Sequence, residues 1–312
     1  MDQSVDEVPA HVRSDRRVSG APGEWPGGCA RRMGVGHVYI AAEEAGEVEK
    51  TLKQRVIALA GRRYIAGTDI DDVARVCKRL SGLGYATTIC YWDGPSDTPD
   101  GVLARYEQAL AAVTGLDSYL SVKATALDFS VERFARIANR GMRLHFDALA
   151  VHTVDRTFGL IGRLQGDRGC TLPGRWRRSD ADAARALEMG LAIRIVKGQF
   201  RGDNDRDPRL GVLSVVDRLA GRARHVGIAT HDRELASEAR HRLRMAGTPC
   251  ELEQLYGIPL ACPPARVYVP YGQALLPYSL AQLKDNPKIL FWLARDAVLR
   301  RSVQIDTRRA QR

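Results

Sequence analysis

The sequence predicts an α/β protein folded as a (β/α)8 barrel of the TIM type, distorted, with added helices and a flexible extension at its amino-terminal side. From Tyr85 onward, short runs of apolar and β-branched residues alternate with amphipathic stretches of helical period. This alternation predicts parallel strands joined by right-handed helical crossovers. Eight such runs lie within about 185 residues, a spacing that favours a closed barrel over an open doubly wound sheet.

The whole chain is expected to divide into two parts. Residues 1–46 are rich in glycine, proline, arginine and aspartate and have no sustained hydrophobic period, so we expect a flexible extension there. Residues 47–312 are expected to form one barrel domain. Its first elements should be two helices, over residues 47–63 and 69–80, because the second segment follows a turn signal and carries acidic residues in its first turn.

The elements of the barrel are expected in a regular order. The expected strands are residues 86–91, 119–124, 143–147, 170–172, 192–196, 226–230, 250–255 and 266–269. The expected helices are residues 99–114, 130–140, 155–165, 179–189, 209–222, 232–246 and 273–284. Residues 257–264, between the last two strands, are too few and too rich in proline to form a full helix.

Composition is that of an ordinary globular protein. Of the 312 residues 45% are hydrophobic and 27% are charged, and no run of ~18 apolar residues predicts a membrane span. No apolar segment near the amino terminus is typical of a signal peptide, so we expect a cytoplasmic protein. The formal net charge is +10, and only seven of the 47 basic residues are lysines. Because the arginines are scattered among acidic residues without a nucleic-acid-binding motif, we expect no nucleic-acid partner.

Motifs for metal and dinucleotide binding are absent from the sequence. The six cysteines form no CxxC pair and the seven histidines form no HExxH motif, so we expect reduced thiols and no metal site. The segment Gly34-Val35-Gly36 lacks the third glycine and the preceding strand of a Rossmann fingerprint. It is therefore expected to be a loop.

Polar residues gather where the expected strands end, which is where TIM-type barrels carry their active sites. They are Lys123, Asp147, Arg194, Lys197, Thr230, His231, Glu251, Glu253 and Tyr268. We expect these side chains to form a polar ring above an apolar core. A lysine within a buried strand is costly unless it is paired, so Lys123 is expected to form an ion pair with Asp147 on the next strand.

Eight short motifs follow one another between residues 60 and 290. They are YIAG (64–67), SVKA (121–124), FDA (146–148), LPGRW (172–176), RIVKG (194–198), ATHD (229–232), ELEQLYG (251–257) and VYVPYG (267–272). In this order and spacing they resemble the motifs of the FAD-dependent proline dehydrogenase family. The chain resembles a divergent member of that family.

The resemblance implies that FAD binds at the mouth of the barrel without a Rossmann domain. The residues expected to hold it are Arg194, Val196, Lys197, Gly198, Thr230, His231 and Glu251. Arg194 would lie near the ring nitrogen that accepts hydride, where a guanidinium stabilises the charge that the flavin gains on reduction.

The resemblance also implies a substrate pocket and a reaction. Lys123, Asp147 and Tyr268 would surround the substrate and, with Arg194, make up the catalytic group. The reaction removes a hydride from the carbon beside an amine nitrogen and leaves an imine. The amine must be neutral for the hydride to leave, so a local base or a lowered amine pKa is required. The acceptor that reoxidises the flavin stays open between a quinone, oxygen and another acceptor.

The chain departs from the family at the clamp for the substrate carboxylate. The family's last helix reads Tyr-x-x-Arg-Arg-Leu-x-Glu-Asn, and here Tyr278 is kept while the arginine positions are Ala281 and Gln282. Because a hydrogen bond to a charged group is worth roughly 1.5–3 kcal/mol, free proline is expected to be a poor substrate. A substitute clamp could come from one of three arginines, Arg201, Arg177 or Arg178.

Three functions remain open at this point. The first, which we favour, is a flavoenzyme that oxidises a C–N bond in a small amine, an imino acid or a carrier-bound prolyl group, such as an intermediate of a biosynthetic pathway. The second is an ordinary proline dehydrogenase, which converts L-proline to 1-pyrroline-5-carboxylate in proline catabolism, with a relocated clamp. The third is a non-catalytic barrel with a binding or regulatory role, against which the retained polar residues argue because burying them is costly.

Overall fold

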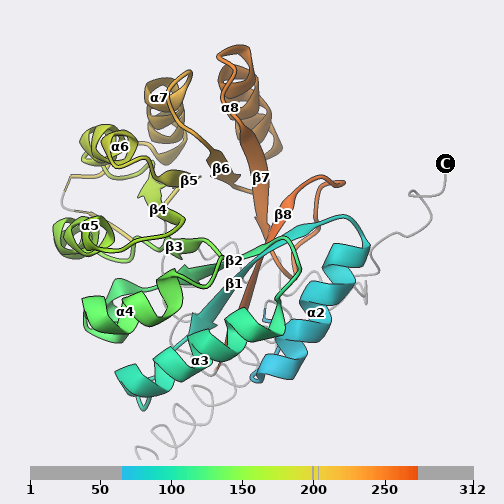
Figure 1. Cartoon of the computed structure of the whole chain (residues 1–312). Helices are drawn as coiled ribbons and strands as arrows, with labels where there is room; N and C mark the ends of the chain where they lie inside the picture. Colours follow the sequence, from blue (N-terminus) through green and yellow to red (C-terminus); the bar gives the residue numbers. More distant parts are fainter. Residues whose placement is uncertain (1–64, 199, 203, 273–312) are drawn as a thin grey trace, which may run out of the picture. The chain divides into compact units, whose positions relative to one another are not determined.

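A closed barrel of eight parallel strands forms the centre of the part of the chain that the structure describes (Figure 1). The computed structural model describes residues 65–198, 200–202 and 204–272. The strands pair in sequence order, and the last strand pairs with the first to close the sheet. This architecture confirms the predicted (β/α)8 fold.

The strands and helices alternate along the chain. The strands are β1 (Ala86–Trp92), β2 (Ser118–Val122), β3 (Leu144–Phe146), β4 (Arg168–Pro173), β5 (Ala192–Val196), β6 (Val226–Ala229), β7 (Cys250–Leu255) and β8 (Arg266–Gly272). The helices are α2 (Ile70–Gly82), α3 (Pro99–Ala112), α4 (Val131–Ala138), α5 (Val154–Arg163), α6 (Ser179–Glu188), α7 (Pro208–Leu219) and α8 (Arg233–Met245), with two short 3-10 helices, η2 (Ala124–Leu127) and η3 (Val151–Thr153).

These elements match the expected ones to within a few residues at each end. The largest extension is at β8, which continues through Pro270 to Gly272 and pairs with β1 along its whole length. Proline has no N–H to donate, and it is tolerated here because the pairing of β7 with β8 already ends at Tyr268. The predictions for residues 1–46, 47–63 and 273–284 fall outside the described residues.

Side-chain caps begin four of the helices. The side chains of Thr98, Ser130, Asp207 and Asp232 accept hydrogen bonds from backbone N–H groups three residues ahead, at 2.9–3.2 Å. Such caps satisfy N–H groups that have no partner within the helix. Two of the capped helices, α3 and α7, also begin with proline, whose fixed φ suits the first helical position.

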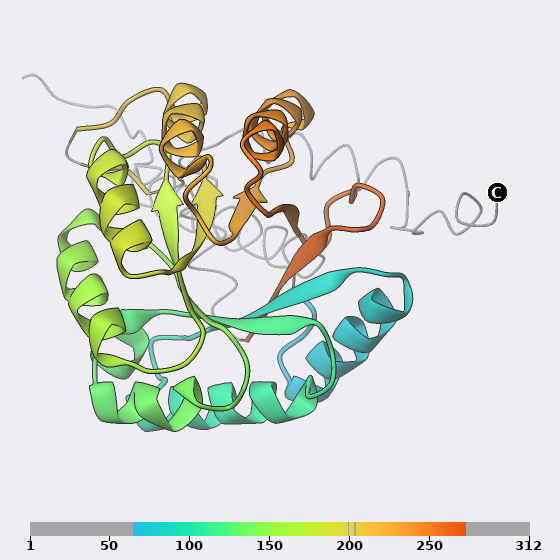
Figure 2. The same cartoon turned by 45° about the horizontal axis from the view of Figure 1, so that its top comes forward.

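The helices cover the outer face of the sheet, and the apolar core lies between the two layers. Phe146 of β3 and Phe134 of α4, for example, are both fully buried, with ring centroids 5.1 Å apart. The connection between β7 and β8 contains no helix, as expected, and it runs as an open loop in Figure 2. Ala261 fixes this loop, because its N–H donates to Gln254 at 2.6 Å and its carbonyl accepts from the Tyr85 hydroxyl at 2.8 Å.

The inside of the barrel is polar. Tyr119 of β2 donates to Glu253 of β7, and Arg194 of β5 donates to Ser121 of β2. These strands are not neighbours, so in a closed barrel their side chains meet across the interior. The expectation of a polar ring above an apolar core is therefore wrong: the apolar core surrounds the barrel, and polar side chains fill it.

Arg266 closes the amino-terminal end of this polar interior. Its guanidinium donates to Glu251 at 2.7 Å, to Asp117 at 2.9 Å and to the carbonyl of Thr87 at 2.7 Å. It also lies over the ring of Tyr119, 4.2 Å from the centroid. These contacts contribute to the stability of the barrel and not to its active site, because the active site of such folds lies at the opposite end.

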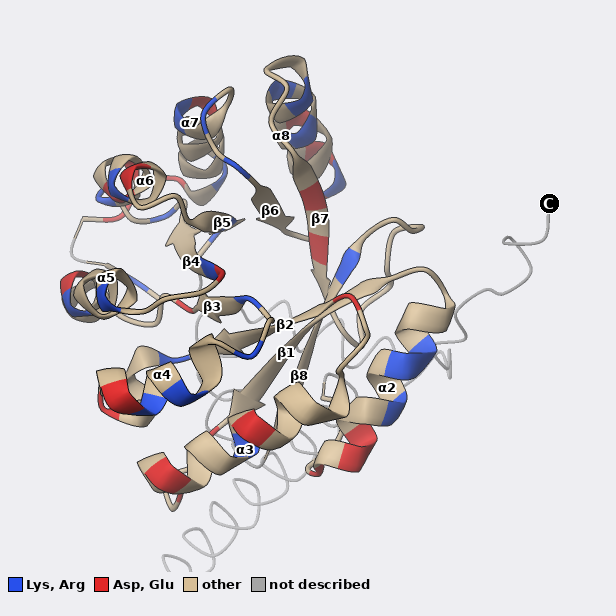
Figure 3. Ribbon diagram, in the orientation of Figure 1, with Lys and Arg blue, Asp and Glu red and all other residues tan. Residues whose placement is uncertain are grey.

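Charged residues of both signs are interleaved on the outer helices (Figure 3). Several arginines pair with carboxylates of a neighbouring helix, as Arg133 of α4 does with Asp100 of α3 at 2.9 Å. The expectation of no nucleic-acid partner stays a prediction. Within the described part of the chain, none of the helices is both long enough and apolar enough to span a membrane.

Replacing Phe134 by alanine should test the packing of the outer core. Removing a fully buried aromatic ring leaves a cavity against Phe146, and such changes cost about 3–5 kcal/mol. Chemical denaturation should show this loss in the free energy of unfolding. The control Met245→Ala, at a side chain of α8 that is 75% exposed, should change it by less than about 0.5 kcal/mol. Equal effects of the two substitutions would contradict the proposed packing.

Candidate active site

A cavity of about 230 Å³ opens at the carboxyl ends of the strands. Its lining comes from β3 to β8 and the loops that follow them: Asp147, Ala148, Leu149, Thr171, Pro173, Trp176, Arg194, Val196, Gly198, Phe200, Ala229, Thr230, His231, Glu253, Gln254, Leu255 and Tyr268. The walls are mainly apolar. The charged groups lie together at one end, which we call the floor and define by Asp147, Arg194 and Glu253.

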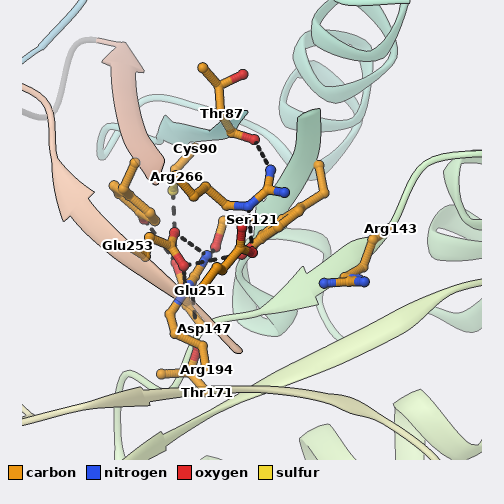
Figure 4. Close-up of polar contacts among 12 residues, drawn as sticks. Thr87, Cys90, Ser121, Arg143, Asp147, Thr171, Arg194, Glu251, Glu253 and Arg266 are labelled. Atoms are coloured by element: carbon orange, nitrogen blue, oxygen red, sulfur yellow. Dashed lines mark hydrogen bonds and ion pairs between the residues drawn. The ribbon is translucent and has the colours of Figure 1, made fainter. Parts of the chain in front are cut away.

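Arg194 is the centre of the floor (Figure 4). Its Nε and Nη2 donate to the two carboxylate oxygens of Glu253 at 2.8 and 2.9 Å, and its Nη1 donates to Asp147 at 2.8 Å. Arg194 and Glu253 are buried, with 3% and 1% of their side chains exposed, and Asp147 is partly buried, with 14% exposed. One guanidinium is therefore held between two carboxylates in the barrel interior.

Hydroxyl groups complete the hydrogen bonding of the two carboxylates. Ser121 and Tyr268 donate to different oxygens of Asp147, at 2.8 and 3.0 Å, and Tyr119 donates to Glu253 at 3.1 Å. The guanidinium of Arg194 also lies 5.2 Å from the ring centroid of Tyr268. Each ionised group of the floor thus has hydrogen-bond partners, which a buried charge requires.

The floor holds its groups in defined protonation states. Burial alone would raise the pKa of Glu253, but the charge and hydrogen bonds of Arg194 outweigh burial and lower it. Burial opposes the charge on Arg194, yet Glu253 and further anionic neighbours raise the pKa of Arg194 well above its usual value. Burial raises the pKa of the Cys90 thiol to about 12, and Asp147, 3.8 Å away, adds to this. At neutral pH the carboxylate and guanidinium are ionised, and the thiol is protonated.

Lys123 does not pair with Asp147, and that prediction is wrong. Strand β2 ends at Val122, so Lys123 lies just beyond it and turns toward Asp93, with which it forms a close ion pair. Asp147 is bound by Arg194 instead. The sequence predicted an ion pair between residues that follow adjacent strands, whereas Asp147 pairs with an arginine on a strand that is not adjacent to β2. Lys123 is not among the residues that line the cavity.

The predicted cofactor residues separate into two groups. Val196, Gly198, Thr230 and His231 line the cavity, as does Arg194. The other two do not. Lys197 turns to Asp232, with its Nζ 2.7 Å from the carboxylate, and Glu251 binds Arg266 at the opposite end of the barrel.

His231 is a neutral ring at the wall of the cavity. Burial lowers the pKa of His231, and its Nε2 accepts a hydrogen bond from the N–H of Leu255 at 2.9 Å. An acceptor nitrogen must be unprotonated, so both observations agree. The ring is thereby fixed between the ends of β6 and β7.

Two loops join to form one wall of the cavity. The N–H of Arg175, after β4, donates to the carbonyl of Lys197, after β5, at 3.0 Å. The indole of Trp176 donates to the carbonyl of Phe200 at 2.9 Å, and both rings line the cavity. Gly198 permits this approach, because it has a φ of +90° and a Cβ there would lie 2.8 Å from the Cβ of Pro173.

None of the three arginines considered as a substitute clamp lines the cavity. Arg178 is bound to Asp155 and Asp182, with its closest contact to each at 2.8 and 2.9 Å. Arg177 is exposed and donates to Asn204 at 3.0 Å. Arg201 is also exposed. The predicted substrate residues Tyr278, Ala281 and Gln282 lie outside the described residues.

Sequence reasoning missed Glu253 of the floor and several residues that contact the floor. Glu253 was noted as polar but not assigned a role, and Tyr119, Ser121, Thr171 and Cys90 were not considered. A signal was present, because polar residues recur at every second position in β2, as Tyr119 and Ser121 do within an apolar strand. Alternate residues of a strand point to the same side, so this spacing marks the barrel interior.

No group of histidine, cysteine and acidic side chains suited to a metal ion occurs in the part of the chain that the structure describes. The five described cysteines are free thiols, with Cys77, Cys90 and Cys170 buried. The expectation of reduced thiols agrees with this for the described residues.

A (β/α)8 barrel with a cavity and a buried charged floor at the carboxyl ends of its strands has the arrangement in which barrel enzymes carry their active sites. The sequence is 23% identical to proline dehydrogenase 1 of Bacillus subtilis subsp. natto over 286 aligned positions, which cover 80% of this chain and 95% of that relative. It is 22% identical, with the same coverage, to proline dehydrogenase 1 of Bacillus subtilis strain 168. The chain is thus similar in sequence to proline dehydrogenases. No family profile matches it.

Solved structures with a similar fold are those of two proline utilization A proteins (PutA). PutA from Bdellovibrio bacteriovorus, inactivated by N-propargylglycine, aligns with a TM-score of 0.62 at 14% identity, over 78% of this chain and 34% of that one. PutA from Corynebacterium freiburgense aligns with a TM-score of 0.61 at 15% identity, over 81% of this chain and 34% of that one. This chain spans about a third of the length of either PutA, and the likeness is one of fold.

Replacing Arg194 by methionine should destabilise the protein strongly. The change leaves Asp147 and Glu253 buried without their counter-charge, and breaking a buried ion pair in this way costs about 3–5 kcal/mol. The free energy of unfolding at pH 7 measures the effect. Arg242→Met is the matched control, because Arg242 also binds two carboxylates but at the surface of α8, where such pairs contribute about 0–1 kcal/mol. A comparable loss in both variants would be evidence against the buried floor.

Proposed function

We propose that the protein is an FAD-dependent oxidoreductase of the proline dehydrogenase type, which oxidises a C–N bond of a small amine or imino acid to an imine. The order of the eight motifs and the similarity to two proline dehydrogenases support this proposal. The observation that carries it is the cavity at the carboxyl ends of the strands, with Arg194, Asp147 and Tyr268 together in its lining.

The chemistry of the cavity suits a flavin ring. Its apolar walls are Ala148, Leu149, Val196, Ala229, Leu255, Trp176 and Phe200, and its floor is polar. Gly198, which lines the cavity, lets the loops after β4 and β5 pack together because it carries no side chain. Val196, Gly198, Thr230 and His231 would hold the ring and its chain, and the half-exposed Lys197 would face the phosphates. FAD, when bound, accepts the hydride that leaves the carbon next to the amine nitrogen.

The floor residues have separate tasks in this reaction. Asp147 is the carboxylate with the larger exposure to the cavity, 14% against 1% for Glu253, so it is the acceptor for the proton that the substrate ammonium must lose. The Tyr268 hydroxyl holds Asp147 in place at 3.0 Å. Arg194 orients both carboxylates by its hydrogen bonds and lowers the pKa of Glu253.

Free proline is not the substrate that this site favours. The family's two clamp arginines are replaced by Ala281 and Gln282, and Arg177, Arg178 and Arg201 do not line the cavity. A buried carboxylate group on a substrate needs cationic hydrogen-bond donors. The alternative function is an ordinary proline dehydrogenase, which the names of the two relatives favour. A purely structural role is disfavoured because burying three charged side chains is costly.

The purified protein should carry FAD, and the flavin absorbance should bleach under anaerobic conditions with members of a panel of small amines. Replacing His231 by alanine removes a ring from the cavity wall and should weaken FAD binding about tenfold. Titration of the flavin-free protein with FAD measures this, with the exposed His152→Ala as control. A colourless protein that FAD does not restore would refute the proposed activity.

Restoring the clamp should create activity on proline. The double variant Ala281→Arg, Gln282→Arg adds the two guanidinium groups that the family uses, so KM for L-proline should fall about 10- to 100-fold. The anaerobic rate of flavin bleaching with L-proline and with L-prolinamide, which lacks the carboxylate, measures the effect. Only the rate with L-proline should rise. Efficient turnover of free proline by the unchanged protein would contradict the substrate preference.

A further inference from the structure

The floor of the cavity contains one cation and two anions. Glu253 takes both Nε and Nη2 of Arg194 in a bidentate pair, at 2.8 and 2.9 Å. Asp147 receives from Arg194 only a bond from Nη1, at 2.8 Å, and it is otherwise bound by hydroxyl groups. A bidentate pair is the stronger arrangement, so the charge of Arg194 is balanced mainly by Glu253. The floor contains no second cation to balance Asp147.

Other described charges around the barrel already have partners. Lys123 is paired with Asp93, and Arg266 is paired with Glu251 at the far end of the interior. At the mouth, Lys197 binds Asp232. Each of these three cations is bound to a carboxylate other than Asp147, and Asp232 binds Arg209 as well as Lys197. Asp147 forms its ion pair with Arg194, which it shares with Glu253.

The uncharged neighbours of the floor do not change this balance. Cys90 stays protonated because burial raises its pKa to about 12, and burial with the charge of Glu253 raises the pKa of Tyr119. His231 is neutral because burial lowers its pKa. With one guanidinium against two carboxylates, the floor carries one formal negative charge.

We propose that Glu253 determines the charge of the ligand: it takes two of the three hydrogen bonds that Arg194 donates to the floor carboxylates, so the charge of Asp147 is only partly balanced and Asp147 attracts a cation and repels a carboxylate. The cavity accordingly takes small amines as ammonium cations whose carboxyl group is absent or is converted to a neutral amide or ester. This inference rests on the proposed function only in calling the ligand a substrate. Glu253 is a positioning residue, since it acts through Arg194 and is itself 1% exposed.

L-Prolinamide and L-proline test this selection because they have the same ring and differ in the neutral amide and the carboxylate. Binding to the full chain is measured by equilibrium dialysis, with any bound flavin reduced beforehand so that turnover does not consume the probes. The wild-type protein should bind L-prolinamide at least about tenfold more tightly than L-proline. Equal binding, tighter binding of L-proline, or no binding of L-prolinamide at millimolar concentration overturns the proposal.

Variants of the carboxylates show whether Glu253 sets the ratio of the affinities for L-prolinamide and L-proline. Glu253→Gln frees Arg194 to neutralise Asp147, so the preference should shrink to within about threefold, while Glu253→Asp should retain it. Asp180→Asn is the matched control, because Asp180 accepts a bidentate bond from Arg206 at 2.8 and 2.9 Å away from the cavity. A preference unchanged in folded Glu253→Gln overturns the proposal.

A second variant keeps the test decisive if Glu253→Gln does not fold. Asp147→Asn removes the unbalanced charge itself and should reduce the preference to a similar degree; an undiminished preference there also overturns the proposal. Because binding is measured without turnover, the two proposals fail separately. A preference for L-prolinamide in a protein that no amine bleaches would leave the ligand charge standing and refute the oxidation.

Discussion

The bidentate contact between Arg194 and Glu253 is the interaction on which the interior of this barrel depends. Without it, Glu253 would be buried without its counter-charge, and breaking a buried ion pair in this way costs about 3–5 kcal/mol, a large part of the stability of most domains. With it, side chains of β5, of β7 and of Asp147 just after β3 are held together across the interior. The same contact fixes the position of Asp147 at the cavity, so the stability of the fold and the chemistry of the site rest on one pair of side chains.

The sequence predicted the fold well because alternation of strands and helices is a local pattern. The residues at strand ends were also found, since Asp147, Arg194 and Tyr268 do line one cavity. The pairing of charges was not predictable in the same way. Lys123 and Asp147 follow consecutive strands, yet a closed barrel lets a long arginine reach across its interior, and Arg194 binds Asp147 while Lys123 turns to Asp93. Sequence order gives neighbours around the barrel but not across it.

The two ends of the polar interior serve different purposes. Arg266 lies at the amino-terminal end, bound to Glu251 and Asp117, and no cavity residue touches it by hydrogen bond among the described contacts. Arg194 lies toward the opposite end and borders open space. Tyr119 connects the two, with its ring over Arg266 and its hydroxyl on Glu253. A resemblance in sequence motifs assigned Glu251 to the cofactor, whereas the two-residue spacing of the strand brings Glu253 to the cavity in its place.

The cross-barrel contacts have a consequence for how the chain can be divided. A fragment ending after β4 would contain Asp147 and Ser121 but neither Arg194 nor Glu253, and the remaining fragment would contain the reverse. Each fragment would expose one part of the ionic cluster, and the two parts are complementary in charge. Tyr119 and Arg266 would be separated in the same way, one in each fragment. The two halves are thus matched to each other by charge as well as by strand pairing, and reassembly of such fragments would favour the correct partner over a second copy of itself.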